Sequence, residues 1–434
     1  MKSNPLNLKS RETGTGPHPL SFLAYPLENT PRHESIINLE RSTDFQKELE
    51  KKNTQGLSSI YIHIPFCDYL CNFCCYFKVL KEQTLTSKYL NFLKREIKLY
   101  SETEFINTSK FSSLYFGGGT PTSLSCSQLA DLLDFCFDNL YLLDDAAVTM
   151  EGCTYNYDKK KLNETLFHGV NRVSFGIQTF NDSLRKILNL KDNSSEAIVA
   201  INNAHKVGYE QVDIDLMYNL PTQKIEEWVS DIEIAIDLGV ESISLFQLAI
   251  YPQSDIHKSL DDKKDKELTD PTKEIEMYLA AKDILIDAGY KQKSYTNFIS
   301  NNQVKHKGIS DNYLACGPVA YGSIGKYVYR NTISLEKYFH ALNNYRFPFS
   351  ELIFLSKDDE MRKYIIRKLL QLRIDIKDFE DKFSLRPQDA YPQIFDELIT
   401  KDLVLESENE LKLSHIGTAW GDNICRAFCR PDWV

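Results

Sequence analysis

The chain has 434 residues, which allows one large domain and one or two smaller parts. Hydrophobic residues make up 42% of it, and the formal net charge is -10 with acidic and basic residues well mixed. This composition provides a sizeable core but no basic surface for nucleic acid or an anionic membrane. No apolar stretch approaches the roughly 18 residues of a membrane-spanning helix, and the N-terminus lacks the apolar segment of a secretory signal. We therefore expect a cytoplasmic protein without nucleic-acid or membrane partners.

Residues 1–55 are polar, and glycines and prolines interrupt any periodic pattern in them. We expect an irregular N-terminal extension that lies over the main domain, with a short helix at 41–51.

Residues 56–330 alternate between β and α patterns, as a parallel sheet with crossover helices requires. The expected strands are 57–64, 111–116, 145–151, 171–176, 211–216, 241–246 and 290–296. The expected helices are 86–101, 127–140, 158–168, 195–207, 224–238 and 271–288, the fourth with its start signal at Ser194 and Ser195. Six such units fit a partial barrel or a doubly wound sheet, and the repeats alone do not distinguish the two.

The pattern changes after residue 330, and we expect a C-terminal domain at 331–434. Residues 350–434 predict three helices, two strands at 403–406 and 411–414 around a polar turn, and a final helix. This is a small, mainly helical domain with a two-stranded wing.

Three cysteines lie within eight residues, Cys67, Cys71 and Cys74, after an apolar run at 60–66 that is typical of a buried strand ended by a proline. Thiolates at this spacing can bind three irons of a cubane iron–sulfur cluster and leave the fourth iron open for chemistry. A structural zinc site usually needs two separated ligand pairs, and ordinary cysteine usage does not indicate a disulfide framework. Zinc and plain buried thiols remain the alternatives. The cysteines that we interpret as packing residues are Cys126, Cys136, Cys153, Cys316, Cys425 and Cys429.

A glycine run at 117–119 ends the second expected strand and precedes Thr120. Bare backbone amides there let a ligand approach closely, although a tight turn explains such a run as well. Polar residues also stand at the ends of the next three strands, namely Glu151, Gln178 and Asp215. Each could singly be a satisfied polar group or a helix cap. Together they form a pattern that core packing does not need, since carboxyl ends of barrel strands carry active sites.

The cysteine loop after a strand, followed by the glycine run, resembles the radical S-adenosylmethionine (SAM) superfamily. Over most of the chain the resemblance is to the oxygen-independent coproporphyrinogen III oxidase family. The segments that carry it are YIHIPFC at 61–67, GGGTPT at 117–122, SFGIQ at 174–178, DLMYNLP at 215–221, DDEMR at 358–362 and NICRAF at 423–428. The resemblance implies an α/β fold: a partial (β/α)6 radical SAM barrel with a small helical C-terminal domain.

The resemblance also implies roles by position. The ligands of a [4Fe-4S] cluster would be Cys67, Cys71 and Cys74. The residues that bind one or two SAM molecules would be Tyr61, Phe73, Gly118, Gly119, Thr120, Glu151, Gln178 and Asp215. Within this set Tyr61 and Phe73 would flank SAM, and the glycines with Thr120 would hold its methionine part.

Two positions depart from the family pattern. The oxidases carry another cysteine two residues after the third ligand, where this chain has Tyr76, and its spare thiol is Cys75 instead. The family's arginine that contacts SAM, twelve residues after the glutamine, is Leu190 here, beside Lys191. These changes are compatible with SAM cleavage and argue against coproporphyrinogen as the substrate.

We therefore expect a radical SAM enzyme that modifies a tetrapyrrole or another aromatic small molecule, by C-methylation. The alternatives are oxidative decarboxylation of coproporphyrinogen III and non-enzymatic haem binding by a chaperone. We expect a monomer that receives electrons from a reductase such as flavodoxin or ferredoxin.

Overall fold

The computed structural model describes residues 6, 8, 39–74, 76–250, 255–258, 271–300 and 310–430. Within these ranges no helix is both long and apolar enough to cross a membrane. Most of the expected N-terminal extension lies outside the described residues. Its described helix, α1 (Leu39–Leu49), begins slightly before the expected 41–51. Phe45 of this helix is fully buried and packs edge-on against the rings of Tyr327 and Phe349.

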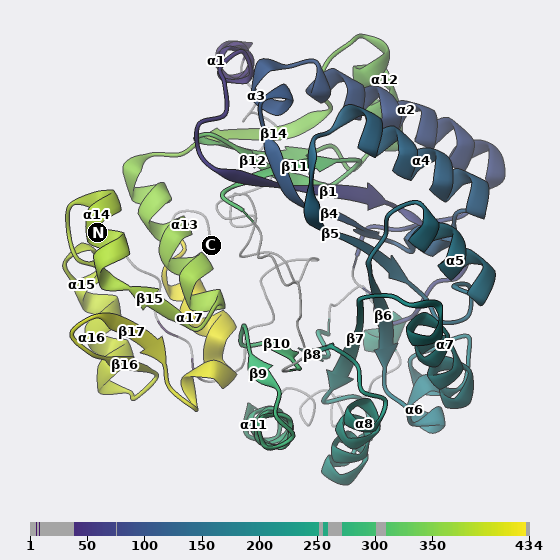
Figure 1. The fold of residues 1–434 in the computed structure, drawn as a ribbon. Coiled ribbons are helices and arrows are strands. Elements are labelled where there is room, and N and C mark those ends of the chain that lie inside the picture. Colours follow the sequence, from purple (N-terminus) through teal and green to yellow (C-terminus); the bar gives the residue numbers. More distant parts are fainter. Residues whose placement is uncertain are drawn as a thin grey trace.

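Twelve strands of the described residues form one large sheet. In spatial order they are β14 (Phe349–Phe354), β13 (Tyr327–Asn331), β12 (Tyr321–Ile324), β11 (Asn312–Cys316), β1 (Leu57–Ile64), β4 (Lys110–Gly118), β5 (Leu142–Gly152), β6 (Arg172–Gln178), β7 (Gln211–Tyr218), β8 (Ser242–Gln247), β10 (Asn297–Ile299) and β9 (Lys291–Gln292). The run from β11 to β8 is parallel, and both ends of the sheet are antiparallel. The parallel strands curve as a partial barrel (Figure 1).

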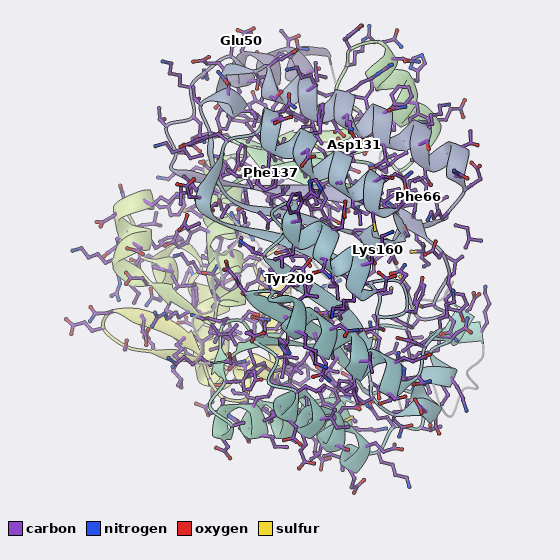
Figure 2. The ribbon with its side chains drawn as sticks, turned by 45° about the vertical axis from the view of Figure 1, so that its right-hand side comes forward. Glu50, Phe66, Asp131, Phe137, Lys160 and Tyr209 are labelled. Carbon is purple, nitrogen blue, oxygen red and sulfur yellow. The ribbon has the colours of Figure 1, made fainter. Side chains whose placement is uncertain are left out.

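Helices cover the outer face of this curved sheet, as Figure 1 shows. The main ones are α2 (Gln83–Ser101), α4 (Cys126–Asn139), α5 (Lys159–Phe167), α7 (Ser194–Val207), α8 (Ile225–Asp237) and α11 (Pro271–Asp287). Shorter helical segments are α3 (Glu104–Asn107), η3 (Pro121–Ser123), α6 (Asp182–Ile187), α9 (Asp255–Lys258) and α12 (Leu335–Asn343). Figure 2 labels Phe137 on α4 and Lys160 on α5 within this outer layer. The apolar faces of these helices and the outward faces of the strands form the main core.

The six expected strands at 57–64 to 241–246 and the six expected helices are confirmed with small shifts at their ends. The last expected strand, 290–296, is wrong. The chain forms the two short strands β9 and β10 there, separated by a turn in which Ser294 Oγ accepts hydrogen bonds from the amides of Thr296 and Asn297 at 3.2 and 3.0 Å. A serine that bonds its own downstream backbone competes with a continuous ladder.

The C-terminal region has its own apolar core, separate from that of the barrel. It contains α13 (Lys357–Leu370), α14 (Ile376–Phe383), α15 (Pro387–Ala390), α16 (Pro392–Thr400), η4 (Gly417–Trp420), α17 (Gly421–Ala427) and a sheet of β15 (Arg373–Asp375), β17 (Glu410–Leu413) and β16 (Val404–Glu406). The expected two-stranded wing is therefore three-stranded. Strand β15 was not predicted because only one of its three residues, Ile374, is apolar.

Polar contacts join this region to the barrel: Lys282 Nζ donates to Thr418 Oγ1 at 2.9 Å, and Tyr295 OH donates to Asp422. We keep the division into parts 1–55, 56–330 and 331–434 as a proposal. In that division β14 is a strand that the C-terminal part contributes to the barrel sheet.

Candidate active site

The three expected cluster cysteines lie on one loop that is closed at its base by β2 (Phe66–Cys67) and β3 (Val79–Leu80), a parallel pair. The amide of Lys81 donates to the carbonyl of Cys67 at 2.9 Å. Within the loop, the amide of Cys74 donates to the carbonyl of Cys71 at 3.4 Å, and Lys78 Nζ donates to the carbonyl of Cys74 at 2.6 Å. The loop therefore leaves the carboxyl end of β1, as expected for a barrel site.

Burial, with a smaller contribution from the neighbouring Cys74 thiol, raises the pKa of Cys67 to about 11 and that of Cys71 to about 12. In the part of the chain that the structure describes, no three His, Cys, Asp or Glu side chains converge to hold a single metal ion. A cubane cluster makes a different demand, because each of its thiolates binds a separate iron.

The glycine run lies directly against the cysteine loop. The amide of Gly119 donates to the carbonyl of Ile64, and that of Thr120 donates to the carbonyl of Phe66, both at 2.8 Å. Thr120 Oγ1 donates to Cys67 Sγ at 3.4 Å. The expectation of bare amides is thus corrected: these amides hold the segment to the strand that leads into the cysteines.

Close backbone approach explains the need for glycine at two of these positions. A Cβ on Gly119 would lie 2.8 Å from the carbonyl carbon and oxygen of Pro65. Gly118 has a φ of 120°, which side chains rarely tolerate, and its amide donates to Glu151 Oε2 at 3.3 Å. The glycines bring the end of β4 within contact of both the cysteine loop and a carboxylate.

Glu151, at the end of β5, is fixed by two donors. Tyr115 OH donates to its Oε1 at 2.5 Å, and the Gly118 amide donates to its Oε2. Burial raises the pKa of Glu151, while these two hydrogen bonds lower it. Asp215 lies close enough for the two carboxylates to interact, and burial followed by the charge of Glu151 raises the pKa of Asp215 to about 7. The structure therefore brings together Gly118, Glu151 and Asp215.

An ion pair that the sequence analysis missed stands next to these carboxylates. Arg172 on β6 pairs with Asp213 on β7, and Gln211 Nε2 donates to Asp213 at 2.7 Å. The guanidinium of Arg172 also lowers the pKa of both Glu151 and Asp215. The available signal was the alternation of these charges with apolar residues, which places them on the inner face of the strands.

Tyr61 and Phe73 do not lie together. Tyr61 stacks on Tyr115 with ring centroids 6.1 Å apart, and its hydroxyl lies 3.0 Å from His63 Nδ1. Phe73 packs in a different apolar cluster, with residues of β7 and α6. Gln178 ends β6 after a bulge and has a φ of 66°, a strained conformation for a residue other than glycine.

The residues that depart from the oxidase pattern are also engaged elsewhere. Leu190 packs in the apolar cluster that contains Phe73. Lys191 is exposed, and its ammonium lies over the ring of Tyr155 at 4.6 Å. Arg185 is buried and donates to the carbonyls of Ile177 and Thr179 at 3.0 and 2.9 Å. Tyr76 is half-buried, and Cys75 lies outside the described residues.

An open parallel barrel with three cysteines on the loop after its first strand, and carboxylates on the following strands, is the architecture of the radical SAM class. Comparisons with known proteins agree. Residues 61–235 match the family model of the radical SAM superfamily. The heme chaperone HemW of Bacillus subtilis (strain 168) is 27% identical over 379 residues, which cover 86% of this chain and 99% of that protein. The HemW of Buchnera aphidicola subsp. Acyrthosiphon pisum is 30% identical over 279 residues, which cover 63% and 71%.

Among solved structures, coproporphyrinogen III oxidase (HemN) from Escherichia coli, described as a radical SAM enzyme, has a TM-score of 0.79. It is 23% identical, and the match covers 89% of this chain and 93% of that chain. The protein belongs to the radical SAM superfamily and, within it, to the HemN-like family. Membership implies a 4Fe-4S cluster and SAM as cofactors. The partial barrel and the helical C-terminal region are confirmed as the fold of this family.

Proposed function

We propose that this protein is an enzyme that cleaves SAM at a 4Fe-4S cluster and C-methylates a tetrapyrrole or another aromatic small molecule. The observation that carries the proposal is the contact between Thr120 Oγ1 and Cys67 Sγ at 3.4 Å. It joins the segment proposed to bind SAM to the loop proposed to bind the cluster. Both cofactors would therefore meet at one edge of the barrel, as electron transfer between them requires.

Cys67, Cys71 and Cys74 would hold the cluster. All three are free thiols, and the raised pKa values of Cys67 and Cys71 mean that iron must displace their protons. The ammonium of Lys78 lowers the pKa of both thiols, so it would stabilise the negative charge that the bound thiolates bring. When bound, the cluster supplies the electron that divides SAM into methionine and a 5′-deoxyadenosyl radical.

Gly118, Gly119, Thr120 and Glu151 would hold the methionine part of SAM. Because the amides of this segment are engaged by the protein, carbonyl oxygens and the Glu151 carboxylate are the groups that it can offer to the ammonium group of SAM. Asp215 and Gln178 would complete the site or contribute to a second one. Tyr61 and Phe73 would contact SAM from two separate apolar clusters.

The aromatic inner wall supports a flat, unsaturated substrate. Tyr61 lies between Tyr115 and Tyr313, with ring centroids 6.1 and 6.3 Å away. Relatives of this chain are named for heme and coproporphyrinogen III, which favours a tetrapyrrole. Tyr76 and the half-buried Leu190 replace a cysteine and an arginine of the oxidases, which favours a different reaction. For C-methylation one SAM molecule would be the radical source and a second the methyl donor.

Electrons would come from a reductase such as flavodoxin or ferredoxin, and the protein would act as a monomer. The need for a reductase follows from the proposed chemistry, because the cleavage of each SAM molecule consumes one electron.

The test uses protein with an anaerobically reconstituted cluster, SAM with a deuterium-labelled methyl group, a strong reductant, and coproporphyrinogen III or haem. The proposal expects a product that carries the label, together with 5′-deoxyadenosine and S-adenosylhomocysteine. A decarboxylated, unlabelled product would make the protein an oxidase. Tight haem binding without any cleavage of SAM would make it a chaperone. The control variant Cys126→Ala, at a half-buried cysteine outside the cluster loop, should behave as the wild type.

A further inference from the structure

Among the described cysteines outside the cluster loop, Cys153 differs from all but Cys126, which is likewise half-buried and outside the apolar core clusters. Cys136, Cys316, Cys425 and Cys429 belong to the apolar cores, as a packing role requires. Among the described residues, Cys153 belongs to none of the apolar core clusters and is half-buried. Its interpretation as a packing residue therefore does not account for its position.

The position of Cys153 is at the proposed cluster site. It follows β5 directly, two residues after Glu151, and its sulfur lies 3.6 Å from Thr120 Oγ1. The same hydroxyl lies 3.4 Å from Cys67 Sγ, so one hydroxyl group contacts a thiol from each of two loops. The thiol of Cys153 also interacts electrostatically with those of Cys71 and Cys67. Four cysteines thus converge on this edge of the barrel rather than three.

The backbone around Cys153 is held firmly. Its amide donates to Thr122 Oγ1 at 3.3 Å, and its carbonyl accepts from the amides of Asn156 and Tyr157 at 3.2 and 3.1 Å. These bonds fix the residue at the end of β5 and leave its short side chain to turn toward the cysteine loop. A thiol mounted in this way is suited to binding metal, because little conformational entropy is lost when it does so.

We propose that Cys153 binds the open iron of the cluster when SAM is absent and gives way when SAM binds. This inference rests on the proposed function, since it requires a cluster held by Cys67, Cys71 and Cys74. In the SAM-free protein, the Cys153 thiol loses its proton to solvent and its sulfur forms a bond to iron. When the amino and carboxylate groups of SAM take that iron, the iron–sulfur bond breaks and the thiolate regains a proton. No electron is gained or lost in the exchange.

The two donor groups of SAM make Cys153 a ligand that SAM can displace. SAM offers two donor atoms in one molecule, so the second donor binds without a further loss of translational entropy. Cys153 would thereby protect the cluster, because the open iron, which otherwise dissociates first, keeps four ligands until SAM binds.

The experiment compares wild type, Cys153→Ala, Cys153→Ser and the control Cys126→Ala, each reconstituted with iron and sulfide. Iron content is measured first, and then the three-iron cluster that appears on mild oxidation is quantified by electron paramagnetic resonance. Without SAM, Cys153→Ala should lose the fourth iron about tenfold faster than wild type, and Cys153→Ser should fall between them. With saturating SAM, all four proteins should lose it equally slowly.

Equal loss in wild type and both Cys153 variants without SAM would overturn the inference while leaving the proposed function intact. A failure of both variants to assemble any cluster would also overturn it, since Cys153 would then be a permanent ligand or a structural residue. If the wild type itself assembles no four-iron cluster, the proposed function is contradicted, and the inference about Cys153 with it.

Discussion

The hydroxyl of Tyr115 donates a 2.5 Å hydrogen bond to Glu151 Oε1, from one inner strand to the next. The other carboxylate oxygen accepts from the amide of Gly118. Burial raises the pKa of Glu151, and both donors oppose that shift by favouring the ionised form. The tyrosine thereby keeps an acceptor for an ammonium group beside the glycine run.

Replacing Tyr115 with phenylalanine should therefore weaken SAM binding near neutral pH by about tenfold, the value of one hydrogen bond to a charged group. Since the pKa of Glu151 rises when the donor is lost, affinity should recover as the pH increases. Equilibrium SAM binding to the reconstituted protein at several pH values measures both effects. The exposed Tyr141→Phe variant is the control. An unchanged affinity with an unchanged pH profile would contradict the assigned role of the pair.

Gly119→Ala should displace the cysteine loop. A Cβ at this position would lie 2.8 Å from the carbonyl group of Pro65, and backbone atoms cannot yield as the end of a side chain can. We expect a loss of about 1–3 kcal/mol in the free energy of unfolding and a lower iron content after reconstitution. Denaturant titration and iron analysis are the measurements. Wild-type values for both would mean that the loop tolerates the shift.

The hydrogen bond from Thr120 to the sulfur of Cys67 should raise the reduction potential of the cluster. Removing it with Thr120→Val should lower the cluster's reduction potential, because donors to a ligand sulfur stabilise the reduced form. A bond of about 1 kcal/mol corresponds to a shift on the order of 40 mV for one electron. Thr120→Ser, which keeps the hydroxyl, should retain most of the wild-type potential. A spectroscopic redox titration that gives one potential for all three proteins would count against this contact.

A buried carboxyl outside the cysteine loop should make stability depend on pH. Glu96 accepts hydrogen bonds from Tyr338 OH at 2.5 Å and from the amide of Gly317 and Asn331 Nδ2, both at 2.7 Å. Burial raises its pKa from 4.5 to about 7. Between these values the folded state binds more protons than the unfolded state, so stability falls as the pH rises through this window.

This carboxyl alone should reduce the free energy of unfolding by up to about 3 kcal/mol as the pH rises from about 4.5 to 7. Glu96→Gln should flatten that part of the profile, whatever its effect on absolute stability. Urea unfolding at a series of pH values measures the slope. The exposed Glu102→Gln should keep the wild-type slope. Parallel profiles for wild type and Glu96→Gln would show that Glu96 does not titrate as expected.

Six of the parallel strands, β1 and β4 to β8, were predictable because each is an apolar run followed by a turn signal and an amphipathic helix. The first residue of a helix was harder to predict. Asn193, rather than Ser194 or Ser195, caps α7 through reciprocal hydrogen bonds with Glu196. All three side chains can accept the hydrogen bond of an N-cap, so the sequence does not distinguish them. Strands β11 to β14 were missed because they are short, and because tyrosines such as Tyr327 and Tyr329 are compatible with a buried strand or a buried helix alike.

The proposed cluster cysteines could be selected from their spacing along the chain, and Glu151 from its place at the end of an expected strand, because both signals are local in the sequence. The ion pair of Arg172 and Asp213 could not, since its partners lie on different strands and become neighbours only through the sheet register. The same is true of Cys153, whose contact with Thr120 joins the ends of β4 and β5.

The most direct test of the central claim is the yield of 5′-deoxyadenosine from anaerobically reconstituted wild type and Cys71→Ala, given SAM and a strong reductant. The cluster-and-SAM account predicts 5′-deoxyadenosine from the wild type and the Cys126→Ala control, and none above background from Cys71→Ala. A fully loaded wild type that forms no 5′-deoxyadenosine, or a Cys71→Ala variant that forms it at the wild-type rate, would contradict the account.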